Sequence, residues 1–378
     1  MALILWNRTS EAVRLQILGG KHIMAATIRD IRKKTGLSLA TISKYLNGGN
    51  VLPENAKAIA NAIDELHYEV NEVARGLATK KTRTIGVLIQ SFENVFAGTL
   101  VSNIESVLRQ HNYSTIVCDS QGDEKLEEEA LHFLISKRVD GIIIIPTANS
   151  PRYLQPVFEK GIPIVLIDRA FQDKTSGEAL PDCEIASVLI DNVKAAKEAV
   201  EVLLNHNHKE IAIICGDDRE YTGRKRLAGY VEALTENDIS IKDAYIKRGK
   251  LTVEHGYQAM KELLSMKERP TAVFMTNYEI TLGGILAINE SGVHFPEEIS
   301  LIGFDNFMLA QIVKPSLWTV AQPMEKIAVT AAELMLEKLG ANITAEEMKE
   351  LLTGIERKTS KQIVLDTSIY KGESVKKL

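Results

Sequence analysis

The chain has 378 residues, of which 45% are hydrophobic and 25% charged, a composition typical of a globular protein with room for two or three domains. Its apolar runs are far shorter than a membrane span, and its three widely spaced cysteines fit neither a metal site nor a disulfide framework. The net charge is −5, but residues 24–83 carry +4 and residues 1–23 carry +2, so the rest of the chain carries −11. We therefore expect a basic head suited to a polyanion on an acidic body.

Residues 1–23 have no clear place in this organisation. Asn7, Arg8 and Glu11 interrupt any apolar core, which excludes a signal peptide. We expect this extension to be disordered, or to lie upstream of a true start at Met24. The intact mass of the protein from its native source tests this, because a product that begins at Met1 contradicts it.

Residues 24–70 carry the signals of two short helices joined by a tight turn. Thr27 can cap a first helix with Asp30 as its capping-box partner, and Gly36 can end that helix in a left-handed conformation. Ser38 can cap a second helix over residues 39–46. This is the layout of a helix-turn-helix, whose second helix enters the major groove of DNA. The alternative is a pair of surface helices in an ordinary bundle.

A third helix is expected after Pro53, which stands at a favoured first-turn position. We expect it to complete a small core formed by Ile31, Ile42, Leu46, Ile59, Ile63 and Leu66, closed by Tyr68. Residues 71–83 follow as a short segment that Gly76 weakens, and it is too short for a stable helix. Such a segment is typical of a linker that folds only on a partner, and a plain interdomain linker is the alternative.

From Thr84 onward, short apolar strands alternate with helices. Strands of this kind indicate parallel sheets that are covered on both faces, and such sheets bind ligands beyond the carboxyl ends of their strands. There are too many strands for one small sheet, so we expect an α/β body of two Rossmann-like subdomains with a cleft between them. The strands end in polar residues, namely Ser91, Asp119, Asp168, Arg169, Asp217, Asn277 and Asp305.

Seven sequence motifs occur along the chain in a characteristic order. They are TIRDIRKKTGLSLATISKYLN, DELHYEVNEVARGLA, TIGVLI, RVDGIIIIP, RLAGY, PEEISLIGFDN and PSLWTVAQP. Through their number, order and spacing, residues 25–345 resemble the lactose/galactose-repressor (LacI/GalR) family of bacterial transcription factors. The resemblance implies a cytoplasmic homodimer that binds a pseudo-palindromic double-stranded DNA operator, with no membrane segment and no cofactor.

The resemblance also implies the division of the chain. It places the helix-turn-helix domain at residues 24–70 and a hinge helix and linker at 71–83. The body should be periplasmic-binding-protein-like. Its N-terminal effector subdomain should comprise residues 84–190 plus 321–350, and its C-terminal effector subdomain residues 191–320 plus 351–378.

By resemblance, Leu39, Ala40 and Lys44 take the positions that read bases. Lysine can donate to guanine acceptors, and small apolar groups suit thymine methyls. Four hydroxyl and amide side chains are expected to lie nearer the DNA backbone, namely those of Thr27, Ser38, Ser43 and Asn47. The hinge helix carries Val73 and Leu77, and Leu77 matches the leucine that the family inserts into the minor groove. Simple helix packing is the alternative for Leu77.

The family's effector contacts map to Phe96, Asp168, Arg169, Thr222, Arg226, Leu251, Asn277 and Asp305. Carboxylates and amides can hold the hydroxyl pairs of a sugar, and Phe96 offers a flat apolar surface. Leu251 and Arg169 replace tryptophans that stack on ligands in the lactose and purine repressors, so a galactoside and a purine are both disfavoured. Two arginines in one cleft instead favour a sugar acid or sugar phosphate over a neutral sugar, although Asp168 and Arg169 can also pair with each other.

No catalytic or metal-binding motif is visible, so an enzyme is disfavoured. His206 and His208 precede a strand in a turn and are interpreted as structural. A sugar-binding transport protein would need a signal peptide and no basic head. We therefore expect a regulator, most simply a repressor, of carbohydrate metabolism that responds to a sugar-type effector. A global catabolite regulator that uses a phosphoprotein corepressor is the alternative within the family.

Overall fold

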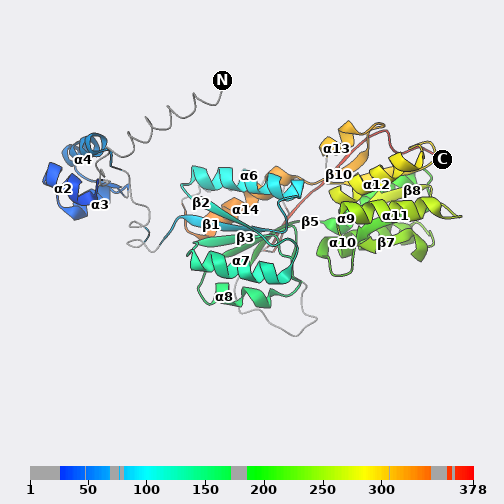
Figure 1. The fold of residues 1–378 in the computed structure, drawn as a ribbon, viewed down its shortest axis with the longest axis horizontal. Helices are drawn as coiled ribbons and strands as arrows, with labels where there is room; N and C mark the ends of the chain where they lie inside the picture. The colour runs from blue at the N-terminus through cyan, green and yellow to red at the C-terminus, as the bar shows by residue number, and fades with distance from the viewer. Residues whose placement is uncertain are drawn as a thin grey trace, which may run out of the picture. The chain divides into compact units, whose positions relative to one another are not determined.

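The computed structural model describes residues 26–46, 48–68, 76, 81–171, 185–305, 307–341, 356–359 and 362–378. The chain forms two compact units, residues 1–82 and residues 83–378 (Figure 1). None of the helices within the described ranges is long and apolar enough to cross a membrane.

The described residues of the first unit form the helices α2 (Ile28–Thr35), α3 (Leu39–Leu46) and α4 (Pro53–Leu66). They pack around Ile31, Ile42 and Ile59, which are fully buried, and Tyr68 lies against the same cluster. The Asp30 carboxylate accepts hydrogen bonds from the Thr27 amide at 2.9 Å and from its hydroxyl at 2.7 Å. This contact fixes the start of α2, and Gly36 ends it with φ of 69°.

The turn between α2 and α3 also follows the sequence. The Ser38 hydroxyl accepts a hydrogen bond from the Thr41 amide at 3.1 Å, as expected of an N-cap. A salt bridge between Lys34 and Glu65 joins α2 to α4. The three-helix arrangement predicted for this unit is therefore confirmed.

The second unit contains two sheets. In the first subdomain, β1 (Thr84–Ile89), β2 (Ser114–Asp119), β3 (Gly141–Ile144), β4 (Ile164–Ile167) and β5 (Ala186–Ile190) pair in parallel in the order β5-β4-β3-β1-β2. The covering helices are α6 (Val95–Gln110), α7 (Glu124–Ser136), α8 (Gln155–Phe158) and α14 (Met324–Lys338), with the short helix η1 (Pro151–Leu154) before α8.

Alternate residues of each strand serve opposite faces of this sheet. Ile143 packs into the core that α6 and α14 cover, whereas Ile142 and Ile144 pack into the core under α7 and α8. Both faces are apolar, which explains why the strands appear in the sequence as continuous hydrophobic runs. Figure 1 shows the sheet between α6 and α14 on one side and α7 and α8 on the other.

The second subdomain repeats this plan. Its strands are β6 (Ile211–Gly216), β7 (Ile246–Gly249), β8 (Ala272–Met275), β9 (Ser300–Phe304) and β10 (Trp318–Ala321), in the order β10-β9-β8-β6-β7. Its helices are α9 (Asn192–Asn205), α10 (Tyr221–Glu236), α11 (Val253–Ser265), α12 (Tyr278–Ser291), α13 (Phe307–Ile312) and the short η2 (Asp243–Tyr245). In each subdomain, strand order reverses beside the first strand, and ligands bind at such switch points.

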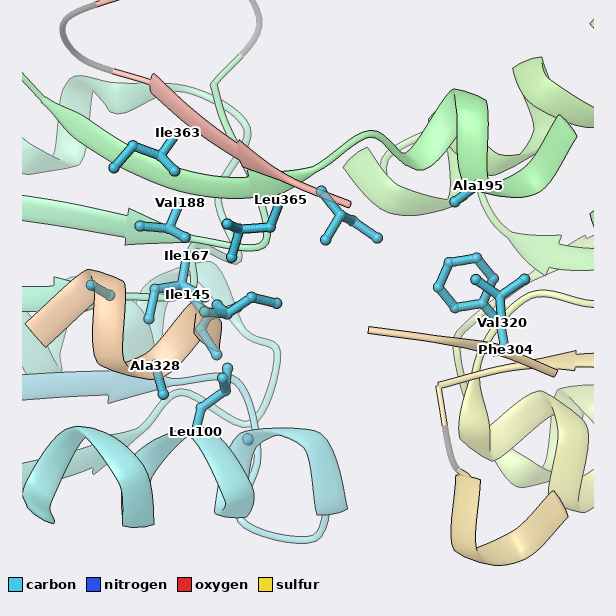
Figure 2. Close-up of a cluster of buried hydrophobic side chains, with 14 of the residues drawn as sticks. Leu100, Ile145, Ile167, Val188, Ala195, Phe304, Val320, Ala328, Ile363 and Leu365 are labelled. Atoms are coloured by element: carbon cyan, nitrogen blue, oxygen red, sulfur yellow. The ribbon is translucent and has the colours of Figure 1, made fainter. Parts of the chain in front are cut away.

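The last strands differ from the expected division of the chain. Residues 351–378 were all expected in the second subdomain, but β11 (Glu356–Thr359) and β12 (Gln362–Leu365) join the first sheet, where β12 pairs in parallel with β5. Ile363 and Leu365 are buried beside Val188 in the first subdomain (Figure 2). Further along the chain, β13 (Ser368–Tyr370) belongs to the second subdomain, where it pairs antiparallel with β10.

Candidate functional site

The exposed surface of α3 carries the residues predicted to read DNA. Ala40 and Lys44 are exposed on the side away from the buried Ile42, and Leu39 and Ser43 are partly exposed beside them. Positions i, i+1, i+4 and i+5 share one face of a helix, so these four side chains form one surface. Thr27 and Ser38 are also exposed, each immediately before a helix. Asn47, Val73 and Leu77 lie outside the described residues.

A cavity in the second unit gathers side chains that follow strands of both sheets. Its lining contains all eight residues predicted to contact an effector: Phe96, Asp168, Arg169, Thr222, Arg226, Leu251, Asn277 and Asp305. Further lining residues are Gln90, Ser91, Asn94, Ala97, Ile145 and Gln322. The cavity leaves only about 50 Å³ for water-sized molecules.

Asp168 and Asp305 occupy matching places in the two subdomains. Asp168 follows β4, and its amide donates to the Val188 carbonyl of β5 at 3.0 Å. Asp305 follows β9, and its amide donates to the Val320 carbonyl of β10 at 2.8 Å. Both have left-handed backbones, with φ of 65° and 83°, which is uncommon for residues other than glycine. Strain of this kind is concentrated at functional sites, where surrounding structure holds it.

Close packing at the start of α10 determines where Thr222 and Arg226 lie. A Cβ on Gly223 would lie 2.8 Å from the Gly216 Cα at the end of β6, so only glycine lets the helix approach the strand this closely. Thr222 and Arg226 lie on one face of α10, four residues apart, and both are buried.

Arg226 is held rigidly. Its Nε donates to Asn192 Oδ1 at 2.9 Å, and its Nη1 donates to the Thr276 carbonyl oxygen. Nη1 also lies 3.8 Å from Asp305 Oδ2, and the guanidinium carbon lies 3.7 Å from the centre of the Phe304 ring. Burial lowers the pKa of Arg226, and the carboxylates of Asp305 and Asp168 oppose this shift. The guanidinium stays charged, because even a lowered arginine pKa lies far above neutrality.

Arg169 lies between two carboxylates. Its Nη1 is 2.7 Å from Glu220 Oε2, and its Nε is 3.7 Å from Asp168 Oδ2. Burial raises the pKa of Asp168, and the positive charges of Arg169 and Arg226 act against that rise. The ion pair of Asp168 and Arg169 considered from the sequence is therefore present, and Glu220 joins it.

Asn277 and Glu279 form a further polar group at the start of α12. Asn277 Oδ1 caps the helix by accepting from the Ile280 amide at 3.0 Å, while its Nδ2 donates to Glu279 Oε2 at 2.5 Å. Burial, reinforced by the charge of Asp305, raises the pKa of Glu279 to about 7. Glu279 was not recognised from the sequence.

Several buried polar atoms around the cavity have no hydrogen-bond partner among the described residues. They are Asp168 Oδ1, Arg169 Nε, Gln322 Oε1 and Asn192 Nδ2. An unsatisfied buried polar group costs about 1–3 kcal/mol, so a ligand that supplies donors and acceptors here would gain binding free energy. Gln322 was missed in the sequence, although it follows β10 just as Asp305 follows β9.

The two histidines singled out in the sequence have structural partners away from the cavity. His208 Nδ1 lies 2.9 Å from Thr271 Oγ1, and its Nε2 lies 2.9 Å from the Lys376 carbonyl oxygen. His206 Nδ1 lies 2.7 Å from the Val202 carbonyl oxygen, and its ring meets Trp318 edge to face. These contacts confirm the structural interpretation and tie the C-terminal residues to the second subdomain.

Two parallel-sheet subdomains of equal strand order, with a polar cavity at their strand ends, define the class of periplasmic-binding-protein-like ligand-binding proteins. Residues 82–361 match the family model described as periplasmic binding proteins and sugar binding domain of LacI family. Catabolite control protein A of Priestia megaterium is 34% identical over 339 residues, which cover 89% of this chain and 99% of that protein. The chain therefore belongs to the LacI family of DNA-binding transcriptional regulators, which are not enzymes.

Other relatives agree with this assignment. The transcriptional repressor PurR of Proteus mirabilis (strain HI4320) is 33% identical over 318 residues, covering 83% of this chain and 90% of the repressor. The Lac repressor dimer bound to operator and the anti-inducer ONPF superposes with a TM-score of 0.76 at 24% identity, covering 93% of this chain and 99% of that one. The transcription regulator CcpA of Lactococcus lactis gives a TM-score of 0.63 at 26% identity, covering 78% and 99%.

Proposed function

We propose that this protein is a cytoplasmic homodimeric repressor that binds a pseudo-palindromic operator and responds to a small polyhydroxyl effector in the cavity of its second unit. The observation that carries the proposal is the convergence of all eight expected effector residues on one cavity. They come from strand ends and helices of both subdomains, so a ligand there would contact both subdomains and would change how they close. A ligand shifts such an equilibrium by its difference in affinity for the two states.

The DNA-reading role is assigned to the exposed face of α3. Lys44 is exposed and can donate to guanine acceptors, while Leu39 and Ala40 can contact thymine methyls. Thr27, Ser38, Ser43 and Asn47 are proposed to contact phosphates, which position the helix without specifying sequence. Val73 and Leu77 are proposed to act in the minor groove.

The charges in the cavity favour an uncharged effector over the acidic one expected from the sequence. Arg169 is already in contact with the carboxylates of Glu220 and Asp168, and Arg226 lies near that of Asp305. A sugar acid or sugar phosphate would have to replace one of these internal partners, whereas a neutral sugar can bond to the polar atoms that lack partners. Among similar solved structures, a LacI family transcriptional regulator from Enterococcus faecium is described with bound ribose, and the transcriptional regulator CelR is described as a complex with cellobiose.

Dimerisation is proposed on exposed apolar side chains of the body. Met308 and Ile312 on α13 are 69% and 71% exposed, and Leu286 on α12 is 44% exposed. In the first subdomain, Phe92 and Val95 at the start of α6 are also exposed. Exposed apolar side chains that join into one patch are typical of surfaces that a partner covers.

A second function has one specific observation in its favour. The similarity to catabolite control protein A extends over 339 residues, so a global catabolite regulator with a phosphoprotein corepressor is the alternative. It predicts that small sugars alone leave the affinity for DNA unchanged.

The proposal is tested by titrating the full chain against DNA from upstream of its own gene, using fluorescence anisotropy. Lys44→Ala should weaken specific binding by about 1–3 kcal/mol, or roughly 5- to 150-fold, because a base contact is lost. Lys33→Ala is the matched control, since it removes the same charge from an exposed position on α2. Equal losses for both variants, or no loss for Lys44→Ala, would refute the assignment of α3.

A further inference from the structure

The cavity is smaller than a typical pocket for a small molecule. It leaves about 50 Å³ for water-sized molecules, whereas pockets for small molecules usually measure about 300–1,000 Å³. The two subdomains must therefore separate to admit a sugar. Any contact that joins the two subdomains across the cleft must break during this separation, so it adds to the free energy of opening.

One such contact joins Arg169 to Glu220. Arg169 follows β4 of the first sheet, and Glu220 directly precedes α10, which packs on the second sheet. The atoms Nη1 and Oε2 lie 2.7 Å apart, with side chains that are 8% and 31% exposed. The N–H groups are not aligned with this oxygen for a hydrogen bond, so the contact is one between charges.

Glu220 places a carboxylate against Arg169, where an acidic group on a ligand would otherwise pair. Arg169 Nε also lies 3.7 Å from Asp168 Oδ2 on its own subdomain, so the guanidinium is flanked by one carboxylate from each side of the cleft. Arg226, the other guanidinium of the cavity, lies near Asp305. Three carboxylates therefore surround two guanidiniums, and this negative balance opposes the entry of a further anion.

We propose that Glu220 is a specificity-determining residue that takes the place of an acidic ligand group. From the second subdomain it pairs with Arg169 of the first, holds the two sides of the cleft together and excludes anionic effectors. This inference rests on the proposed effector function of the cavity, and it adds which ligands the cavity rejects and which contact joins the two sides of the cleft.

Hydrogen exchange of the full-length protein tests the closure directly. Glu220→Gln should raise amide exchange by roughly fivefold in peptides covering residues 90–97 and 217–222, the effect of losing a partly exposed ion pair. Glu232→Gln is the matched control, because Glu232 lies on α10, which Glu220 directly precedes, and pairs with Lys197 within the second subdomain at 3.2 Å. Exchange in Glu220→Gln that equals exchange in Glu232→Gln and in the wild type would overturn the proposal.

Inorganic sulfate serves as the anionic probe in the same experiment, with chloride at equal ionic strength as its control. Sulfate should restore protection in Glu220→Gln by occupying Arg169, and it should leave the wild type unchanged. Protection of the wild type by sulfate, or no effect on the variant, would contradict the role of Glu220 as an internal anion. Because these measurements use neither DNA nor a sugar, their failure is distinct from a failure of the proposed regulatory function.

Discussion

Arg226 connects the stability of the body to its proposed site, and its replacement has a calculable cost. Arg226→Met keeps an unbranched side chain but removes the charge that faces Asp305 and Asp168, together with the hydrogen bonds to Asn192 and Thr276. Removing one partner of a buried ion pair costs about 3–5 kcal/mol. At 2–4 °C per kcal/mol for a domain of this size, the thermal midpoint should fall by roughly 6–20 °C.

The pH dependence of that loss identifies its cause. Burial raises the pKa of Asp168, and Arg169 and Arg226 oppose the rise, so removing Arg226 should raise that pKa further. A carboxyl with a raised pKa binds protons more readily in the folded state. Stability therefore falls as pH rises from the unfolded value of about 3.9 through the raised folded value. The loss of stability caused by Arg226→Met should consequently be largest at neutral pH and should become smaller on acidification.

The assay is thermal unfolding followed by circular dichroism at pH 5 and pH 8. Arg226→Lys is the matched variant, because it keeps the positive charge but loses the forked hydrogen bonds. It should lose less stability than Arg226→Met and should show little difference between the two pH values. A midpoint within about 2 °C of the wild type in Arg226→Met, or equal losses at both pH values, would refute this reasoning.

Two further predictions concern packing and titration. Gly229→Ala should destabilise the body by about 1–3 kcal/mol, because its Cβ would lie 2.2 Å from the Val193 carbonyl oxygen on α9. Gly98→Ala on α6 has open space and should be neutral or stabilising by up to about 1 kcal/mol, as thermal unfolding of both variants can show. Glu279 has a folded pKa of about 7, above its ordinary 4.5, so the wild type should lose stability as pH rises through that interval. Glu279→Gln should lose less across the same interval, and parallel unfolding profiles for the two proteins would contradict this.

Local signals in the sequence predict the head of the protein well. Asp30, Gly36, Ser38 and Pro53 each act within a few residues of their position, through caps and backbone preferences, so the three helices follow from the sequence. The buried strands are similarly visible, because both faces of each sheet are covered. The strand β7 is less visible, since IKRG lies at the edge of its sheet and is mostly polar.

Contacts between distant segments explain what the sequence does not reveal. Glu220 resembles any acidic residue before a helix, and only the packing of α10 opposite β4 brings it to Arg169. Two arginines therefore favoured an acidic effector in the sequence, while the structure pairs each with internal carboxylates. The placement of β12 beside β5 depends on pairing between residues more than 170 positions apart, which no local pattern predicts.

The central claim is that occupation of the cavity changes the affinity of the head for DNA. It is tested most directly by anisotropy titration of the upstream DNA with wild type and Asp305→Asn, in the presence of ribose, cellobiose, glucose, gluconate or glucose 6-phosphate. A neutral sugar should change the affinity of the wild type about 5- to 150-fold, the range of typical coupling energies. Asp305→Asn should bind the DNA normally without that response. Equal affinity of the wild type for a scrambled sequence, or an undiminished sugar response in Asp305→Asn, would contradict the claim.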